Sequence, residues 1–273
     1  MRRIVIWNCK MALDRKWDAL LSLRPDLAVI PECARKHAED CSAQTGGSCG
    51  WVGENPHKGL GVFSFNGTTV DISEAIDRNI QVIAPIEVGG ALACRLLAVW
   101  AKHPKGQRPG GRGHWVGPLL TGLDRYADWL CAGNAIVAGD FNNHVRWDQR
   151  GKANNHANAV RQLNGLGLQS AYHLHRGVAQ GQEPEPTLHW KTQEKDRNTY
   201  HIDYCFLSRD LVGRLVNVTL GSYEDWVAKH NAQTSDHVPL IVDLGLGPIS
   251  TAPPVHAASA PAPSIAPLLP FAQ

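Results

Sequence analysis

Four short motifs with acidic, amide or imidazole side chains follow one another along this chain, each next to an apolar run typical of a β-strand. In order, they are Trp7-Asn8, Pro31-Glu32, Gly139-Asp140-Phe141-Asn142 and Ser235-Asp236-His237. Carboxylate and amide oxygens at strand ends are ligands that Mg²⁺ prefers, and an imidazole can move protons near neutral pH. Together, these residue types meet the needs of a metal-assisted phosphodiester hydrolysis.

Glu32 is the strongest candidate for a metal ligand. It follows the apolar run 27–30, so we expect its carboxylate just beyond the end of a buried strand. Because Mg²⁺ is bound through one or two carboxylates and keeps several waters, one well-placed Glu can be the principal ligand. Asn8 offers an amide oxygen at the end of the first strand. The alternatives are an ordinary strand-end acid for Glu32 and a strand-terminating turn for Asn8.

Asp140, Asn142 and His237 are candidate catalytic residues. Gly139 allows a sharp turn after a short buried strand, where Asp140 can accept a proton from a water or orient it. Asn142 can donate to a phosphate oxygen. His237 is suited to proton chemistry, and Asp203 is a candidate partner that would fix its tautomer. A simple Asx turn and a structural histidine are the alternatives, and the choice of general base is open between Asp140 and His237.

Apolar runs and helical spacing predict the elements that position these motifs. Strands are predicted at 3–7, 27–30, 59–65, 70–72, 92–100, 135–138, 204–207 and 240–244. Helices are predicted at 13–23, 119–130 and 156–163. Asn66-Gly67 is a strong turn signal and predicts a hairpin between the third and fourth strands. This mixture of helices and hairpin-like pairs indicates an α/β sandwich with mixed sheets, not a doubly wound parallel sheet.

The four motifs in this order resemble those of the endonuclease/exonuclease/phosphatase superfamily, over about Arg3 to Leu244. The resemblance implies the deoxyribonuclease-I-like fold, in which two packed mixed β-sheets are flanked by helices and the site lies at one end. It also implies that Glu32, Asn8 and Asp236 lie at a Mg²⁺ site, which Mn²⁺ could also occupy. The same resemblance implies that Asp203 pairs with His237.

Two positions depart from the family pattern. Pro31 stands where Gln is usual before the metal-binding Glu, which leaves the carboxylate in place. Trp100 stands where many members have Tyr or His, and an indole cannot act as an acid or base. Lys102 or His103, just beyond Trp100, is therefore expected to contact the phosphate instead.

The residues 102–114 include four cations and no acid, among glycines and prolines, and predict a flexible basic loop. A second group of cations follows Asn142, and aromatic residues are interleaved with the motif loops. Cations on phosphates with aromatics against bases describe a nucleic-acid groove, and the alternative is a set of solvated surface loops. The predicted substrate-binding residues are Trp100, Lys102, His103, Lys105, Arg108, Arg112, Trp190 and Tyr200.

The preferred interpretation is a Mg²⁺-dependent nuclease that hydrolyses DNA. The alternative is a phosphatase or phosphodiesterase on a small phosphorylated substrate, such as an inositol phosphate, a nucleotide or a lipid head group, because the same fold serves all of these. A binding protein without activity ranks last, because it predicts eroded site residues. All seven candidates are present: Asn8, Glu32, Asp140, Asn142, Asp203, Asp236 and His237.

Composition sets few further limits. The chain has 273 residues, of which 43% are hydrophobic, and a formal net charge of +2, which neither requires nor excludes a nucleic-acid partner. Seven irregularly spaced cysteines without a CxxC pair argue against a zinc site. No apolar run approaches the length of a membrane span or a signal-peptide core, so we expect a cytoplasmic protein without a membrane partner.

The last part of the chain, residues 245–273, differs from the predicted catalytic domain, residues 1–244. It contains seven prolines and no Asp, Glu, Lys or Arg. Such a segment cannot form a core and is predicted to be disordered. The alternative is a docking segment for another protein that ends in Leu268-Leu269-Pro270-Phe271. The sequence does not predict the oligomeric state.

Overall fold

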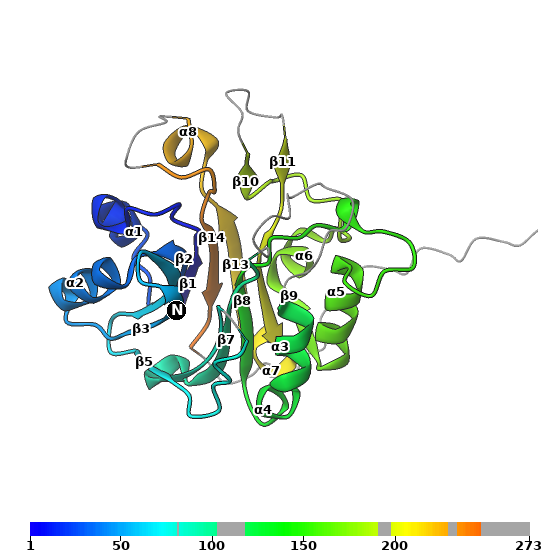
Figure 1. Cartoon of the computed structure of the whole chain (residues 1–273), viewed down its shortest axis with the longest axis horizontal. Coiled ribbons are helices and arrows are strands. Elements are labelled where there is room, and N and C mark those ends of the chain that lie inside the picture. The colour runs from blue at the N-terminus through cyan, green and yellow to red at the C-terminus, as the bar shows by residue number, and fades with distance from the viewer. Residues whose placement is uncertain (81, 103–117, 191–197, 229–233, 247–273) are drawn as a thin grey trace, which may run out of the picture.

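Two mixed six-stranded β-sheets pack face to face in the centre of the molecule, with helices on both outer sides (Figure 1). The structure is a computed structural model and describes residues 1–80, 82–102, 118–190, 198–228 and 234–246. The predicted fold class, a sandwich of two mixed sheets flanked by helices, is confirmed. Most of the basic loop after Lys102, and the tail from residue 247, lie outside the described residues.

The first sheet has the strand order β13-β14-β1-β2-β4-β3. Its β1 and β2 are parallel, and its other neighbours are antiparallel. The strands are β1 (Arg2–Ile6), β2 (Leu27–Cys33), β3 (Cys49–Asn55), β4 (Lys58–Ser64), β13 (Leu215–Leu220) and β14 (Leu240–Leu244). Because β14 pairs with β1, the segment before β14 is brought next to the residues that follow β1.

The second sheet has the order β5-β6-β7-β8-β12-β9, with β7 and β8 parallel. Its strands are β5 (Thr69–Ile72), β6 (Ile83–Gly89), β7 (Cys94–Trp100), β8 (Ala135–Asp140), β9 (Leu168–Ser170) and β12 (Asp203–Ser208). A short pair, β10 (Leu188–His189) and β11 (Thr199–Tyr200), projects at one end of the sandwich together with α8 (Tyr223–Trp226) (Figure 1).

Three apolar cores hold these layers together. Residues of β1 alternate, so that Ile4 and Ile6 pack between the two sheets while Val5 and Trp7 pack under the helices of the first sheet. Since both faces of the central strands are covered, they consist of continuous apolar runs, which is why the sequence predicts them well. The first sheet is covered by η1 (Leu13–Lys16), α1 (Trp17–Ser22) and α2 (Arg35–Thr45).

The second sheet is covered by three helices on its outer face, which bury a separate core. They are α3 (Leu119–Arg125), α4 (Ala127–Cys131) and α5 (His156–Gly165). Two further helices, α6 (Ala171–Arg176) and α7 (Arg209–Val212), add Tyr172 and Leu211 to the core between the sheets. Short 3₁₀ helices are η2 (Gly90–Leu92) and η3 (Val145–Trp147).

No helix among the described residues is both long and apolar enough to cross a membrane.

The predicted hairpin around Asn66-Gly67 is wrong. The turn itself is present, because Asn66 and Gly67 have φ angles of 55° and 75°. However, β4 pairs with β2 and β3 in the first sheet, whereas β5 pairs with β6 in the second. The turn therefore carries the chain from one sheet to the other.

Other boundaries also differ from the prediction. The helix predicted at 13–23 is a 3₁₀ turn followed by the short α1, and the helix predicted at 119–130 is divided at Tyr126 into α3 and α4. The strand predicted from residue 92 begins at Cys94, after η2.

The seven cysteines, all within the described residues, are free thiols.

Candidate active site

Two aspartates face each other across neighbouring strands at one end of the second sheet. Asp140 ends β8, Asp203 begins β12, and the two are direct partners in the antiparallel ladder. Both are fully buried. Like charges directly opposite each other on a ladder are unfavourable, and so are buried carboxylates in general. This costly arrangement indicates a functional site at this end of the sheet.

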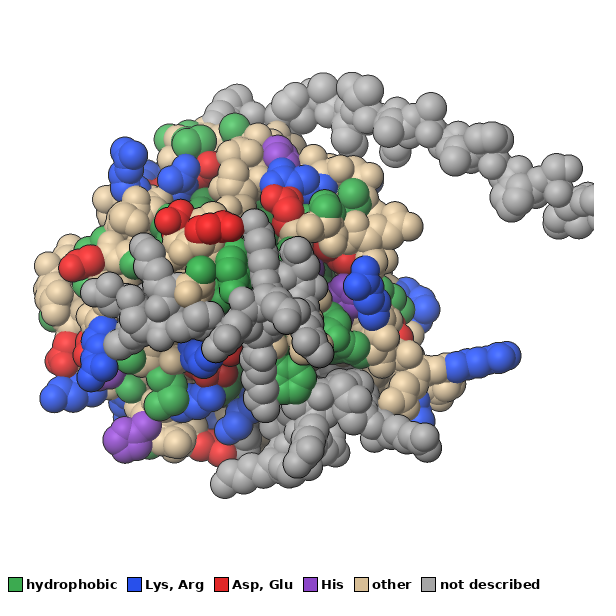
Figure 2. Space-filling model, turned by 90° about the horizontal axis from the view of Figure 1, so that it is seen from above, with side chains coloured by type: hydrophobic (Ala, Val, Ile, Leu, Met, Phe, Trp, Pro, Cys, Tyr) green, Lys and Arg blue, Asp and Glu red, His purple; other side chains and the backbone are tan. Residues whose placement is uncertain are grey.

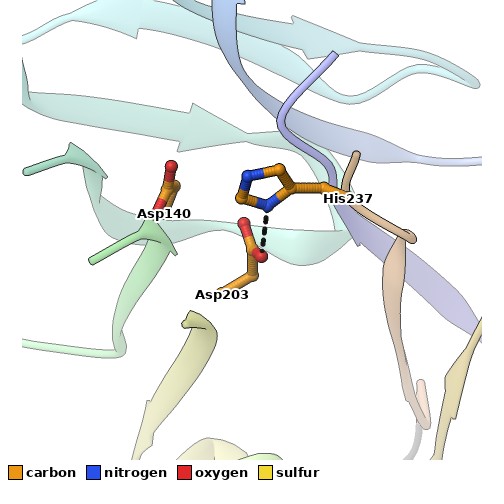
Figure 3. A group of neighbouring side chains, drawn as sticks. All are labelled: Asp140, Asp203 and His237. Atoms are coloured by element: carbon orange, nitrogen blue, oxygen red, sulfur yellow. Dashed lines mark hydrogen bonds and ion pairs between the residues drawn. The ribbon is translucent and has the colours of Figure 1, made fainter. Parts of the chain in front are cut away.

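His237 lies beside both aspartates and pairs with one of them (Figure 3). Its Nδ1 is 2.8 Å from Oδ2 of Asp203, and its other ring nitrogen lies on the side of Asp140. The backbone is fixed by two further bonds, because Trp7 Nε1 donates to the His237 carbonyl and the His237 amide donates to Ser235 Oγ. The Asp203–His237 pair that the resemblance implied is thus present. Asp140, Asp203 and His237 are called the site cluster below.

Two asparagines hold the Asp140 carboxylate. Asn8 Nδ2 donates to Oδ2 of Asp140 at 2.9 Å, and Asn142 Nδ2 donates to the same oxygen at 3.0 Å. The Asn142 amide donates to Oδ1 at 2.8 Å, which is the predicted Asx turn. The Asx turn, considered above as the alternative to a catalytic role, is therefore present together with the bond from Asn8 to Asp140. Phe141, between Asp140 and Asn142 in the chain, packs in the core under α5.

Gly139 is required by the close approach of β7. A Cβ atom at this position would lie 1.8 Å from the carbonyl oxygen of Val99, and its φ is 144°. Only glycine allows this conformation next to a neighbouring backbone. Gly139 thereby delivers Asp140 to the end of the ladder between β7 and β12.

The site cluster perturbs the ionisation of its own members. Burial raises the pKa of Asp140 to about 7, with a further contribution from Asp203, while His237 and Asn8 act in the opposite direction. Burial disfavours the charged ring of His237, but the Asp203 carboxylate outweighs it and raises the pKa of His237 to about 10. The pKa values of Asp140 and His237 are thus both raised, and such displaced values are characteristic of coupled acids and bases in active sites.

Glu32 and Asp236, the predicted charged metal ligands, each form an ion pair with a lysine. Glu32 lies within β2 rather than just beyond its end, at a bulge where its φ is 65°, and that prediction is corrected. Its Oε2 is 2.9 Å from Lys58 Nζ. Asp236 Oδ2 is 3.0 Å from Lys10 Nζ. Burial alone would raise the pKa of Asp236, but His237 and Lys10 lower it below the ordinary value.

The donor atoms present fit a divalent metal ion. Within the described residues, ligand atoms of Asp140, Asp203 and His237 all lie within 4.8 Å of one another. Asp203 Oδ1 is buried and has no hydrogen-bond partner, so this carboxylate has an unused oxygen. Glu32 and Asp236 are not members of this group of ligand atoms among the described residues, and their carboxylates, 19% and 22% exposed, pair with Lys58 and Lys10. Carboxylate oxygens are suited to Mg²⁺ or Mn²⁺, whereas the charged ring of His237 has no free lone pair for a metal.

The predicted substrate-binding residues are only partly brought together. Trp100, a direct ladder partner of Asp140, is 3% exposed, and the ammonium groups of Lys58 and Lys102 lie 5.4 and 5.7 Å from its ring centroid. Tyr200 packs edge-on against Trp147, with ring centroids 4.5 Å apart, and Trp190 follows β10. His103, Lys105, Arg108 and Arg112 lie outside the described residues. Seen from this end, acidic and basic side chains are interspersed on the described surface (Figure 2).

Sequence reasoning missed the two lysines that contact the predicted metal carboxylates. Lys10 lies two residues after Asn8, and this proximity to a motif is a signal that could have found it. Lys58 has no such signal. It is 26 residues from Glu32 in sequence and reaches it only because β4 pairs with β2 across the bulge.

Comparison with solved structures identifies the fold. An AP endonuclease from Archaeoglobus fulgidus is 17% identical with a TM-score of 0.63, and 89% of this chain and 99% of that chain are covered. A 3'-5' exonuclease from Neisseria meningitidis is 16% identical with a TM-score of 0.64 and the same coverage. An endonuclease/exonuclease/phosphatase from Bacteroides vulgatus is 14% identical with a TM-score of 0.62, covering 90% of this chain and 99% of that one.

The sequence itself matches no protein-family model and no curated protein. The structural matches therefore establish the fold: this chain has the deoxyribonuclease-I-like fold of the endonuclease/exonuclease/phosphatase superfamily. At these identities they do not by themselves assign an activity.

Proposed function

We propose that this protein is a divalent-metal-dependent phosphodiester hydrolase that acts on DNA. The observation that carries the proposal is the site cluster. It combines an Asp203–His237 pair of 2.8 Å with a second buried aspartate, which two asparagines orient. The cluster lies at the end of a sandwich whose solved neighbours include an AP endonuclease and a 3'-5' exonuclease.

Each member of the site has a distinct role in this proposal. Asp203 fixes the His237 ring through Nδ1, so that the other ring nitrogen can donate to a phosphate oxygen. Asn142 orients Asp140 and can donate a second hydrogen bond to the phosphate. The Asp140 carboxylate, with its pKa raised to about 7, accepts a proton from the attacking water. This assigns the general base to Asp140, because His237 is held in its charged form by Asp203.

The proposed metal ligands are Glu32, Asn8 and Asp236. A bound Mg²⁺, or Mn²⁺ in its place, supplies Lewis-acid stabilisation of the phosphate and of the leaving oxygen. The lysines next to the two carboxylates, Lys58 and Lys10, keep these side chains in place through ion pairs. Both ammonium groups are also available to phosphate oxygens, since 36% and 57% of their side chains are exposed.

A cleft lined by Lys58, the ion-pair partner of Glu32, supports a polyanionic substrate. It has a volume of about 310 Å³ and lies between the β3–β4 hairpin and residues of the segments 76–80 and 82–83. Four cations line it, accompanied by the acids Glu54 and Asp77 and by the ring of Trp51. The cations are Arg35, Lys58, Arg78 and Lys102. Cations and an aromatic face next to a hydrolytic site suit a nucleic-acid strand.

A phosphomonoester is the second candidate substrate. One solved neighbour from Neisseria, 17% identical with a TM-score of 0.63, is described as a 3' phosphatase bound to product DNA hairpin. A terminal phosphate on DNA would use the same cluster and the same cations. A small phosphorylated metabolite would not need the cleft.

A substrate panel tests the proposal. The purified protein would be incubated with plasmid, linear duplex, single-stranded DNA, RNA, 3'-phosphorylated duplex and small phosphomonoesters, each with Mg²⁺, Mn²⁺ or chelator. We expect metal-dependent cleavage of DNA. Efficient hydrolysis of a small phosphomonoester, with no cleavage of any nucleic acid, would contradict the proposed substrate.

Substitution of Glu32 tests the metal assignment. Glu32→Gln removes the charged ligand, so we expect Mg²⁺ affinity to fall by roughly 10–100-fold or more in calorimetric titration, with partial recovery of activity at high Mg²⁺. Glu39→Gln is a matched control, because Glu39 is an exposed acid of the neighbouring α2 that pairs only with Arg35 among the ion pairs found. Unchanged affinity in Glu32→Gln would exclude Glu32 as the principal ligand.

A further inference from the structure

The loop after β1 has an unusual backbone. Lys10, Met11 and Ala12 have φ angles of 49°, 64° and 50°, so three successive residues other than glycine adopt the left-handed conformation. Side chains make this conformation unfavourable, and it normally occurs at single positions. Such a run persists only where the surrounding structure holds it.

Lys16 supplies that support from the end of η1. It is 2% exposed, and its Nζ donates to the backbone carbonyls of Cys9, Met11 (2.9 Å) and Lys10 (3.5 Å). An ammonium group has three donors and no acceptor, and here three carbonyls receive them. Burial lowers the pKa of Lys16, while nearby acids, including Asp236 and Glu32, oppose this effect. The ammonium group of Lys16 is thus bonded to the carbonyl of Cys9 and to the carbonyls of two residues of the left-handed run.

The same loop carries two side chains into the site. Asn8, at its start, donates to Asp140, and the Lys10 amide donates to Asn8 Oδ1 at 3.0 Å. Lys10 Nζ then pairs with Asp236. The Cys9 amide donates to the carbonyl of Pro31, next to Glu32. The position of the loop therefore sets the geometry of groups on both sides of the site cluster.

We propose that Lys16 is a positioning residue, whose buried ammonium shapes the 9–12 loop so that Asn8 reaches Asp140 and Lys10 reaches Asp236. Lys16 itself does not touch the site cluster in any described contact. Its consequence for catalysis rests on the proposed function, whereas its effect on the loop does not. Lys16 thereby differs from the exposed Lys10 and Lys58, whose ammonium groups are proposed to contact substrate.

Chemical rescue provides the test. Lys16→Ala removes three methylene groups and the ammonium, which together correspond to n-propylammonium. We expect the rate of metal-dependent cleavage to fall by roughly 10–100-fold, the range associated with small misplacements at a site. Added n-propylammonium should restore much of the loss, while tetramethylammonium at equal ionic strength should not, because it has no N–H to donate.

A matched variant separates positioning from general destabilisation. Leu20→Ala creates a cavity in the same core, since Leu20 is fully buried in α1. At temperatures where both variants are folded, we expect Leu20→Ala to retain the wild-type rate and to be unaffected by n-propylammonium. Equal losses in both variants, or no rescue of Lys16→Ala, would overturn the inference.

Hydrogen exchange of the peptide that contains residues 8–13 provides a readout independent of activity. Lys16→Ala should exchange faster than wild type in this peptide, n-propylammonium should reverse the change, and Leu20→Ala should match wild type there. If the wild-type protein hydrolyses no phosphoester, the proposed function fails while this comparison still decides the role of Lys16. Wild-type exchange in Lys16→Ala would overturn that role.

Discussion

Two neighbouring clusters of histidine and carboxylate side chains differ in their balance of acids and bases. In the site cluster, two buried acids share one imidazole. In the second, here called the imidazole cluster (His144, His156, His173 and Glu183), two of the three imidazoles, those of His144 and His173, share one acid. Tyr204, next to Asp203 in the chain, links them, because its ring packs against His156 and His173.

The imidazole cluster satisfies its carboxylate completely. Glu183 accepts from His173 Nε2 at 2.9 Å, from His144 Nε2 at 3.2 Å and from the Gly181 amide at 2.8 Å. His144 Nδ1 accepts the amide of Arg146, so the proton of the neutral ring lies on Nε2 and is donated to Glu183. Burial would raise the pKa of Glu183, but these hydrogen bonds lower it strongly.

The comparison shows that composition alone does not make a reactive site. Two imidazole rings contact Glu183, whereas Asp140 and Asp203 face each other with only one imidazole beside them. Burial, with a further contribution from Asp203, raises the pKa of Asp140, and Asp203 Oδ1 has no hydrogen-bond partner. We therefore expect substitutions in the first cluster to change activity, and substitutions in the second to change stability.

The largest effect is expected from Asp140→Asn. Loss of the base should lower the rate of cleavage on the order of 10³-fold, within the range of general acid–base catalysis. The unfolding free energy should stay within about 1 kcal/mol of wild type, because removal of a buried charge offsets lost hydrogen bonds. Steady-state rates and chemical denaturation measure the two quantities. Retained activity would remove Asp140 from the mechanism.

The Asp203–His237 pair should behave as a unit. His237→Ala is expected to lower the rate by roughly 10²–10³-fold, as expected for loss of a stabilising donor. If Asp203 acts only by orienting His237, the double variant Asp203→Ala/His237→Ala should be little slower than His237→Ala alone. Multiplicative losses in the double variant would show that the two residues act independently.

Glu183→Gln should lower stability and keep the rate of cleavage, whereas Asp140→Asn should lower the rate and keep stability. The amide leaves at least one buried imidazole N–H without an acceptor, so we expect a loss of about 1–3 kcal/mol of unfolding free energy. The folded variant should keep its rate. Denaturant titration and rate measurements at low temperature distinguish these quantities, and a large loss of rate in fully folded protein would place Glu183 in the site.

The last expected effect concerns His156, is limited to acid pH and leaves the stability at neutral pH unchanged. Burial lowers the pKa of His156 to about 4, and its Nε2 is bonded to Gln180. Because the folded pKa lies below the ordinary value of 6.5, the stability associated with the neutral ring is fully present above pH 6.5 and is lost as the pH falls towards 4. The total change is on the order of 3 kcal/mol.

His156→Phe isolates this contribution, because phenylalanine retains a ring against Tyr204 but does not titrate. The variant should show a flatter dependence of unfolding free energy on pH between 4 and 6.5. An unchanged slope would indicate that other groups cause the acid sensitivity.

The sequence predicted the parts of the site that depend on strand ends. The buried runs before Asn8 and Asp140 are unambiguous, and the family resemblance implied the Asp203–His237 pair. The sequence did not predict that β4 and β5 belong to different sheets. The residues Asn66-Gly67 predict a turn, but they do not determine which strand the next strand pairs with. The contact of Lys58 with Glu32 was missed for the same reason, since strand pairing creates it.

Lys16 illustrates a signal that is present but was not used. It lies at helical spacing between the apolar residues Leu13 and Leu20, on a face that is otherwise buried. A lysine at such a position is unusual and requires buried acceptors. Those acceptors are carbonyls of a left-handed loop, which residues 10–12 do not reveal because none of them is glycine.

The most direct test of the account is single-turnover cleavage of a labelled DNA duplex by wild-type protein, Asp140→Asn and Glu183→Gln, each with Mg²⁺ or chelator. The account predicts Mg²⁺-dependent cleavage by wild type and by folded Glu183→Gln, and almost none by Asp140→Asn. Cleavage by Asp140→Asn at the wild-type rate, or cleavage by wild type that persists in chelator, would contradict it.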